Sequence, residues 1–155
     1  MKAIAHRAGP TGFTHTVTIR NHELTVDEDK HGGGGDLGPT PQELLAASLA
    51  TCTAITVEMY AARKGWDIGA IDVAVAYTPA ERGCPTRFKL DLRVPPNLTD
   101  EQRERLQVIA AKCPVHRILE GEVMFDDHLT VSEQADAPSD APKRDTLLKR
   151  SLSRT

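Results

Sequence analysis

Hydrophobic and polar residues alternate in four stretches of the chain, the pattern of strands that bury one face. Residues 13–19 and 23–29 are separated only by the turn Arg-Asn-His, so the pair predicts a β-hairpin. Residues 70–77 and 87–94 alternate in the same way. We also expect a final strand over residues 121–131, Gly-Glu-Val-Met-Phe-Asp-Asp-His-Leu-Thr-Val.

A long helix is predicted between the two pairs of strands. Thr40 is a good N-cap, Pro41 suits the first helical position, and Glu43 stands where a capping box needs it. The helix is expected to run to Lys64, because Gly65 ends it. Its apolar residues cover most of the circumference, which indicates a central, buried helix.

Two further helices are expected near the end of the apolar pattern. Thr99 begins a second capping box, and the helix behind it is predicted to continue to Cys113. Pro114 then opens a short third helix. Because hairpins and helices do not alternate as βαβ units, the chain is predicted to be α+β.

Composition narrows the functional classes. The net charge of −3 gives no basic footprint for nucleic acid. Only 4% of the 155 residues are aromatic, so the core is expected to be thin, a hint of oligomerisation. The apolar run 44–62 is interrupted by polar residues and no signal peptide is visible, so we expect a cytoplasmic protein that does not span a membrane.

Domain organisation follows from a change in composition after Val131. Residues 1–131 are expected to form one domain, and residues 132–155, first acidic and then basic, a disordered or mobile tail. The run of glycines in the loop 30–39 lacks the Gly-Lys-Ser/Thr ending of a phosphate loop.

The chain has three cysteines, Cys52, Cys84 and Cys113. Cys52 shares a helical stripe with four apolar residues, namely Leu45, Leu49, Ile55 and Met59. It is therefore either a buried small hydrophobe or a reactive thiol. Cys113 precedes Pro114, where the first turn of the next helix favours a thiolate. A reactive thiol with a resolving thiol is the minimal apparatus for reducing a peroxide, although spacing alone does not bring the two together.

Two motifs in order make the chain resemble a known family. GPTPQELLAASLATCTA around Cys52 and AAKCPVHRIL around Cys113 are similar to the OsmC/Ohr family of osmotically inducible and organic-hydroperoxide-resistance proteins. The resemblance covers roughly residues 13–131. Within the family the two motifs are more similar to the general OsmC-like branch than to the Ohr proteins.

The resemblance implies a fold and an activity. The fold would be antiparallel sheets wrapped around a long central helix, in an intertwined homodimer with its active sites at the subunit interface. The activity would be reduction of organic hydroperoxides, with Cys52 as the peroxidatic thiol and Cys113 as the resolving thiol. A dithiol such as dihydrolipoamide would be the reductant, and no cofactor or metal is implied.

The chain departs from the active members at one position. Those proteins carry a glutamate ten residues before the helix cysteine, where this chain has Gln42, and Glu43 stands nine before. Glu43 is either the orienting carboxylate or only a capping residue. An arginine should hold the thiolate, and Arg20 is the candidate, unless it is simply a solvated turn residue.

Other functions stay open. The departure at Gln42 leaves a dimeric small-molecule binding protein, or a thiol sensor without turnover, as alternatives to the peroxidase. Cys113 and His116 have a spacing of three, but no second pair of ligands accompanies them, which argues against a zinc site. Cys84 has no surrounding motif and is expected to have no catalytic role.

Overall fold

The structure, a computed structural model, describes residues 1–131. The predicted tail, residues 132–155, lies outside the described residues. The chain divides into one unit, Met1–Val123, and a second that begins at Met124. The helices and strands found among residues 1–131 belong to the first unit.

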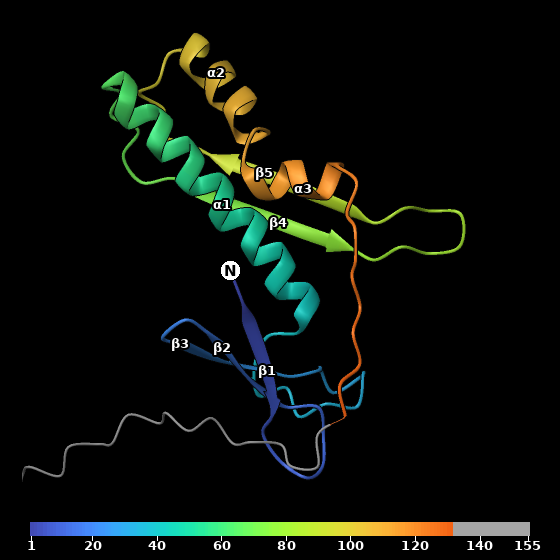
Figure 1. The fold of residues 1–155 in the computed structure, drawn as a ribbon. Helices are drawn as coiled ribbons and strands as arrows, with labels where there is room; N and C mark the ends of the chain where they lie inside the picture. The colour runs from blue at the N-terminus through green and yellow to red at the C-terminus, as the bar shows by residue number, and fades with distance from the viewer. Residues whose placement is uncertain (132–155) are drawn as a thin grey trace, which may run out of the picture. The chain divides into compact units, whose positions relative to one another are not determined.

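The first sheet has three antiparallel strands in the order β1-β2-β3 (Figure 1). These are β1 (Ala3–Arg7), β2 (His15–Ile19) and β3 (His22–Val26). The hairpin predicted from alternation is confirmed as β2–β3, paired from Ile19↔His22 to His15↔Val26. Strand β1 was not predicted, because its residues are mostly exposed and form a strand only by pairing with β2.

The long helix α1 (Pro41–Lys64) has the predicted bounds. Thr40 and Glu43 form the complete capping box, and Gly65 ends the helix in the left-handed region with φ 66°. By length and composition alone this helix would suffice to cross a membrane, a property that core helices of soluble proteins share.

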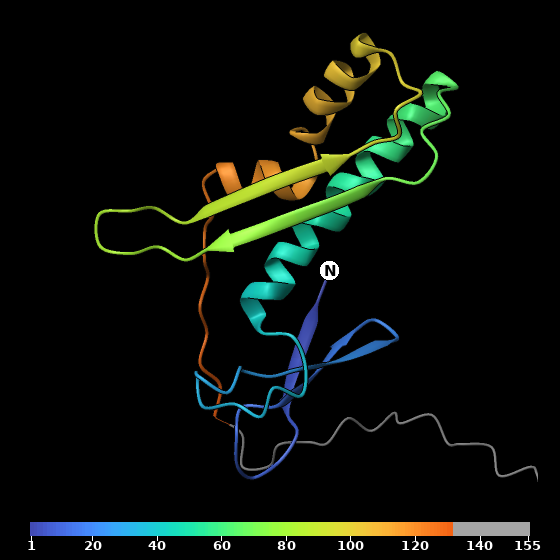
Figure 2. The same ribbon diagram turned by 180° about the vertical axis from the view of Figure 1, so that it is seen from behind.

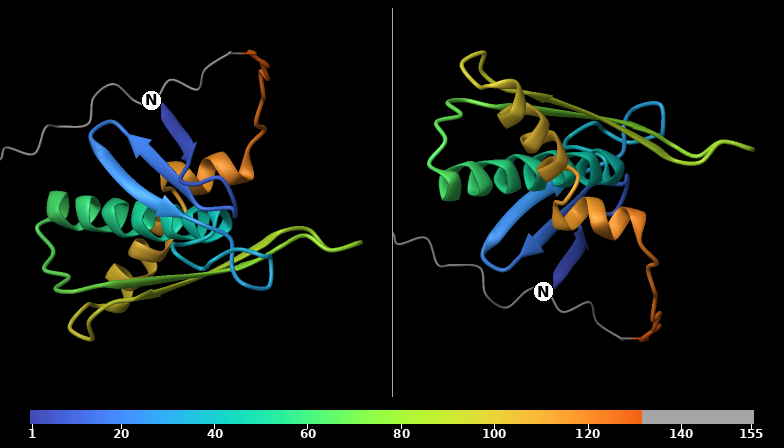
Figure 3. Two further views of the ribbon diagram at one scale, coloured as in Figure 1. Left: turned by 90° about the horizontal axis from the view of Figure 1, so that it is seen from below. Right: turned by 90° about the horizontal axis from the view of Figure 1, so that it is seen from above.

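The second sheet is a two-stranded antiparallel ribbon of β4 (Asp72–Thr78) and β5 (Arg87–Arg93). The ribbon runs beside α1, and its connecting loop, residues 79–86, extends well past the strands (Figures 2 and 3). Cys84 lies exposed in that loop.

Helices α2 (Asp100–Ala110) and α3 (Pro114–Glu120) follow. The prediction that the second helix reaches Cys113 is wrong by three residues. A residue that precedes proline is biased away from the helical region, and Cys113 has extended backbone angles of φ −64° and ψ 145°.

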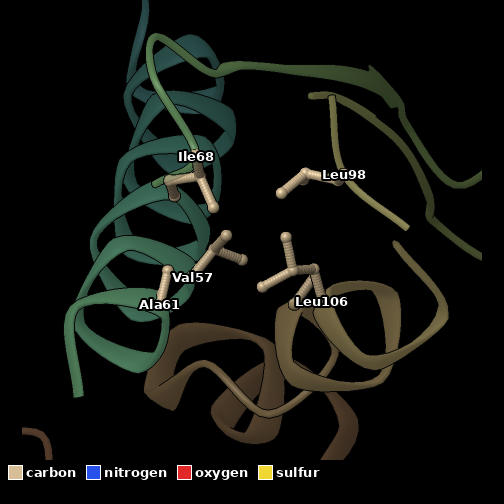
Figure 4. Close-up of a cluster of buried hydrophobic side chains, with 6 residues drawn as sticks. Val57, Ala61, Ile68, Leu98 and Leu106 are labelled. Carbon is tan, nitrogen blue, oxygen red and sulfur yellow. The ribbon is translucent and has the colours of Figure 1, made fainter. Parts of the chain in front are cut away.

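The core of the first unit forms where α1 packs on β4, α2 and α3. Its buried side chains come from α1, from the loops that precede β4 and α2, and from α2 itself (Figure 4), and they are Val57, Ala61, Ile68, Leu98, Leu106 and Ala110. On α1 the buried residues Leu49, Thr53, Val57 and Ala61 recur every four positions, which is one row along a helix.

The expectation that α1 is buried around most of its circumference is therefore wrong for the single chain. Leu45, Ile55 and Met59 are 39%, 49% and 62% exposed. The elements of one chain cover one side of the helix, and the other apolar side has no cover within the described residues.

The predicted final strand over residues 121–131 is also wrong. Residues 122–131 form no helix or strand, and the apolar side chains of Met124, Phe125 and Leu129 are exposed. A strand needs a neighbour to accept and donate its backbone hydrogen bonds. Within the described residues this segment pairs with no other strand.

A buried carboxylate holds the loop between β3 and α1. Asp27 is only 1% exposed, and it accepts hydrogen bonds from the backbone N–H groups of Glu28, Gly35 and Leu37 and from the Thr14 hydroxyl, at 2.8–3.3 Å. The loop also requires glycine for close approach, since a Cβ on Gly34 would lie 1.9 Å from the Glu28 carbonyl oxygen. The glycine run is thus part of a tightly bonded loop that leads into α1.

The pKa of Asp27 follows from these contacts. Burial acts to raise the pKa, but hydrogen bonds from Glu28, Leu37, Thr14 and Gly35 outweigh burial and hold the pKa below its ordinary value of 3.8. The ionised carboxylate therefore stabilises the folded chain above pH 3.8, and this contribution is lost as the pH falls from 3.8 through the lower folded-state pKa.

We predict that Asp27→Asn lowers the free energy of unfolding at pH 7, and that the difference from the wild type narrows as the pH falls below 3.8. Urea unfolding at a series of pH values measures this difference. Asp72→Asn, at an exposed position of β4, is the control and should change little. A difference that stays constant with pH would contradict the assignment.

Candidate functional site

Cys52 lies in the middle of α1 at the boundary between two faces. On one side is the buried row that includes Thr53, and on the other the exposed apolar residues Ile55 and Met59. Cys52 itself is partly exposed. It is thus neither sealed in the core nor a free surface residue.

Cys113 is fully buried and serves as the N-cap of α3. Its Sγ accepts a hydrogen bond from the backbone N–H of His116 at 3.3 Å, as an N-cap side chain does. The expectation that Cys113 stands at the first turn of the following helix is confirmed. Pro114, which has no N–H of its own, occupies the first helical position.

The Sγ of Cys113 has a second donor, which comes from α1. The Thr53 hydroxyl donates to this sulfur at 3.5 Å, and both side chains are fully buried. Thr53 is the neighbour of Cys52, so the fold brings Cys113 to the turn of α1 that carries Cys52 across 60 positions of sequence. All three cysteines of the chain are free thiols here.

Glu43 is occupied as a capping residue. Its Oε2 accepts the backbone N–H of Thr40 at 2.8 Å, while its own N–H donates to the Thr40 hydroxyl at 3.2 Å. Cys52 is nine residues further along α1, which is about 13 Å of helix rise. The Glu43 carboxylate therefore belongs to the start of α1 and does not reach Cys52 of its own chain.

Arg20 lies in the two-residue turn between β2 and β3. It is exposed, and its φ of 57° lies in the region that favours glycine or asparagine. Among residues 1–131 no hydrogen bond or ion pair joins Arg20 to Cys52. Within one chain the structure thus brings Cys113 toward Cys52, but neither Glu43 nor Arg20.

Two side chains near Cys113 were not assigned a precise role from the sequence. Thr53 is a polar residue in an otherwise apolar buried row of α1. Its polarity at that position is the feature of the sequence that could have indicated a role. Nδ1 of His116 is buried without a hydrogen-bond partner among residues 1–131, while Nε2 lies 3.1 Å from Oε1 of Glu120. His116 also borders a groove of about 640 Å³ between β5, α2 and α3.

Metal ligands do not gather in the described part of the chain. No three histidine, cysteine, aspartate or glutamate side chains between residues 1 and 131 lie close enough to share an ion. The pair Cys113 and His116 is instead joined by the capping hydrogen bond.

Comparison with known proteins decides the family. The model of the OsmC-like protein family matches residues 32–126, which include both Cys52 and Cys113. The chain belongs to the OsmC-like family. No curated protein matches its sequence significantly.

Solved structures show the same fold as this OsmC-like protein. A Psychrobacter arcticus protein named for osmotic stress induction and detoxification aligns with TM-score 0.66 and 21% identity, over 76% of this chain and 87% of that chain. An OsmC-like protein from Mycoplasma pneumoniae aligns with TM-score 0.62 and 20% identity, over 77% and 85%. The organic hydroperoxide resistance protein OhrB of Bacillus subtilis aligns with TM-score 0.55 and 22% identity, over 77% of this chain and 90% of that chain.

We predict that the two capping residues of this OsmC-like protein respond differently to substitution. Thr40→Ala removes the N-cap acceptor and should cost about 1 kcal/mol of unfolding free energy. Glu43→Gln keeps an acceptor for the Thr40 N–H and should stay within about 0.5 kcal/mol of the wild type. Urea unfolding compares the two, and a loss in Glu43→Gln as large as that in Thr40→Ala would show that the Glu43 charge is needed for folding.

Proposed function

We propose that this OsmC-like protein reduces organic hydroperoxides with Cys52 as the peroxidatic thiol and Cys113 as the resolving thiol. The observation that carries the proposal is the hydrogen bond from Thr53 to Cys113 Sγ, which holds the second thiol against the turn of α1 that carries the first. Membership of the OsmC-like family and the structural likeness to proteins named for organic hydroperoxide resistance support it.

The proposed reaction has three steps: attack on the peroxide, formation of the disulfide, and reduction by a dithiol. The Cys52 thiolate attacks the peroxide oxygen distal to the organic group, the O–O bond breaks, and the alkoxide leaves as an alcohol after taking a proton. Cys52 is left as a sulfenic acid. The Cys113 sulfur attacks the Cys52 sulfur and the S–O bond breaks. The leaving hydroxide takes the proton that the Cys113 thiol gives up and departs as water, which gives the disulfide. A dithiol such as dihydrolipoamide then restores both thiols by exchange and becomes a disulfide itself.

The preference for organic peroxides rests on the surroundings of Cys52. Ile55 and Met59, within two turns of Cys52, present apolar side chains beside it. An apolar substituent on the peroxide gains free energy by leaving water for such a surface. Hydrogen peroxide has no such substituent, so it is the poorer substrate in this proposal.

The working unit in this proposal is a homodimer in the cytoplasm. One chain leaves an apolar face of α1 exposed around Cys52, a feature that commonly marks an interface. A second copy on this face would enclose Cys52 and form a pocket around it. The second copy would also supply Arg20, which would hold the thiolate. It would likewise supply Glu43 or Gln42, which would orient that arginine.

A dimeric binding protein or a thiol sensor is the alternative. It is favoured by Glu43, whose carboxylate is engaged in the capping box, and by Gln42, which has no charge to contribute. Such a protein would keep the dimer and its pocket but would show no sustained turnover of peroxide.

The direct test is consumption of cumene hydroperoxide and of hydrogen peroxide with dihydrolipoamide as reductant. We expect faster consumption of the organic peroxide, no turnover in Cys52→Ser, and sulfenic acid accumulating after one turnover in Cys113→Ser. Cys84→Ser is the control and should turn over like the wild type, since Cys84 lies exposed on a distant loop. Turnover retained in Cys52→Ser, or none in the folded wild type, would overturn the peroxidase.

The dimer makes a separate prediction. Light scattering should give twice the chain mass of 16.9 kDa for the wild type. Ile55→Lys places a charge on the exposed apolar face of α1 and should shift the protein toward the monomer. Val108→Lys, at a similarly exposed position of α2, is the matched control. A wild-type monomer, or equal dissociation in both variants, would contradict this interface.

A further inference from the structure

Three threonines of α1 use their hydroxyl groups in two different ways. Thr51 and Thr56 donate to the carbonyl oxygens four residues earlier, those of Ala47 and Cys52, both at 2.7 Å. That is the ordinary use of a threonine hydroxyl within a helix. Thr53 instead donates to Cys113 Sγ on another element of the fold. Its hydroxyl therefore serves a contact with the thiol and not the helix itself.

Burial makes this contact matter. Thr53 and Cys113 are both fully buried, so no water replaces the hydrogen bond when the hydroxyl is removed. The backbone N–H of His116 donates to the same sulfur. Two donors, from α1 and from α3, thus converge on one sulfur and restrict where it can lie.

Thr53 is also linked to Cys52 by the backbone. The two are consecutive residues in a rigid helix, so a sulfur held by the Thr53 hydroxyl is held at a fixed place relative to Cys52. Attack by one sulfur on another depends on such placement, because a disulfide forms only within a narrow range of distances and angles.

We propose that Thr53 is a positioning residue that holds Cys113 for its attack on oxidised Cys52 and so speeds disulfide formation. This inference rests on the proposed function. Thr53 does not touch the peroxide. In the step that it serves, the Cys113 sulfur bonds to the Cys52 sulfur, the group that Cys52 carried leaves with the electron pair of its bond, and Thr53 keeps the attacking sulfur in line.

The test isolates this step without any peroxide, in a Cys84→Ser background. An aromatic disulfide reagent, 5,5′-dithiobis(2-nitrobenzoate), reacts first with partly exposed Cys52 and releases one coloured thiolate. Cys113 then attacks the mixed disulfide on Cys52, forms the Cys52–Cys113 disulfide, and releases a second thiolate. Rapid-mixing absorbance thus separates the first release from the second. A further Cys52→Ser substitution is the control and should abolish both rapid releases, because Cys113 is buried.

Two conservative variants separate the effect of the hydroxyl from that of packing. Thr53→Val keeps the volume and loses the donor, and we expect its second release to slow about tenfold while the first is unchanged. Thr53→Ser keeps the donor and loses a methyl group, and its second release should stay within about threefold of the parent. Circular dichroism confirms that each variant is folded.

Three results would overturn the proposal. In the first, the second release in Thr53→Val is as fast as in the parent. In the second, the second release in Thr53→Ser is as slow as in Thr53→Val, which would make packing the cause of the slowing. In the third, the folded parent gives no second release, so the two thiols never meet. Peroxide consumption is measured on the same proteins. If peroxide is not consumed but the second release depends on the hydroxyl, the peroxidase fails and the role of Thr53 stands.

Discussion

The burial of a single row of α1 is the constraint from which the rest of the structure follows. Leu49, Thr53, Val57 and Ala61 stand four residues apart on α1, the helix that packs against β4, α2 and α3. Because α2 and α3 must both lie on this row, the junction between them is brought against the helix, and that junction contains Cys113. The placement of the second thiol is thus a result of core packing, and one buried hydrogen bond refines it.

The same packing leaves the other side of α1 uncovered. A chain with few aromatic residues fills a small core, and Ile55 and Met59 stay exposed beside Cys52. In our proposal this face is both the dimer interface and the wall of the peroxide pocket. That arrangement would reconcile the two initial interpretations of Cys52, since the thiol would be surrounded by apolar side chains without lying in the core of one subunit.

Local chemistry made much of the fold predictable from the sequence. Capping boxes at Thr40 and Thr99, a glycine at 65 and alternation in β2 to β5 act within a few residues, so their signals are visible in the chain itself. The predicted end of the second helix was wrong for a local reason, the bias that Pro114 imposes on Cys113. The errors in the strands arose where structure depends on distant partners. β1 exists because β2 pairs with it, and residues 122–131 remain without a strand partner in the described chain.

The candidate site divides in the same way. The motifs in the sequence identified Cys52 and Cys113. The start of α3 at Pro114 could also be predicted, because proline suits the first position of a helix. The contact between Thr53 and Cys113 could not be predicted from the sequence, because it joins residues 60 positions apart and depends on how α3 packs on α1. Glu43 and Arg20 do not reach Cys52 within one chain, so their proposed roles depend on a second copy.

The location of the disulfide after oxidation decides whether Cys52 and Cys113 act together. The protein is treated with one equivalent of an organic hydroperoxide, its remaining thiols are blocked, and its peptides are identified by mass spectrometry. We expect a Cys52–Cys113 linkage within one chain, with Cys84 still a free thiol. Cys52 oxidised beyond sulfenic acid beside an unreacted Cys113, or a linkage through Cys84, would contradict it.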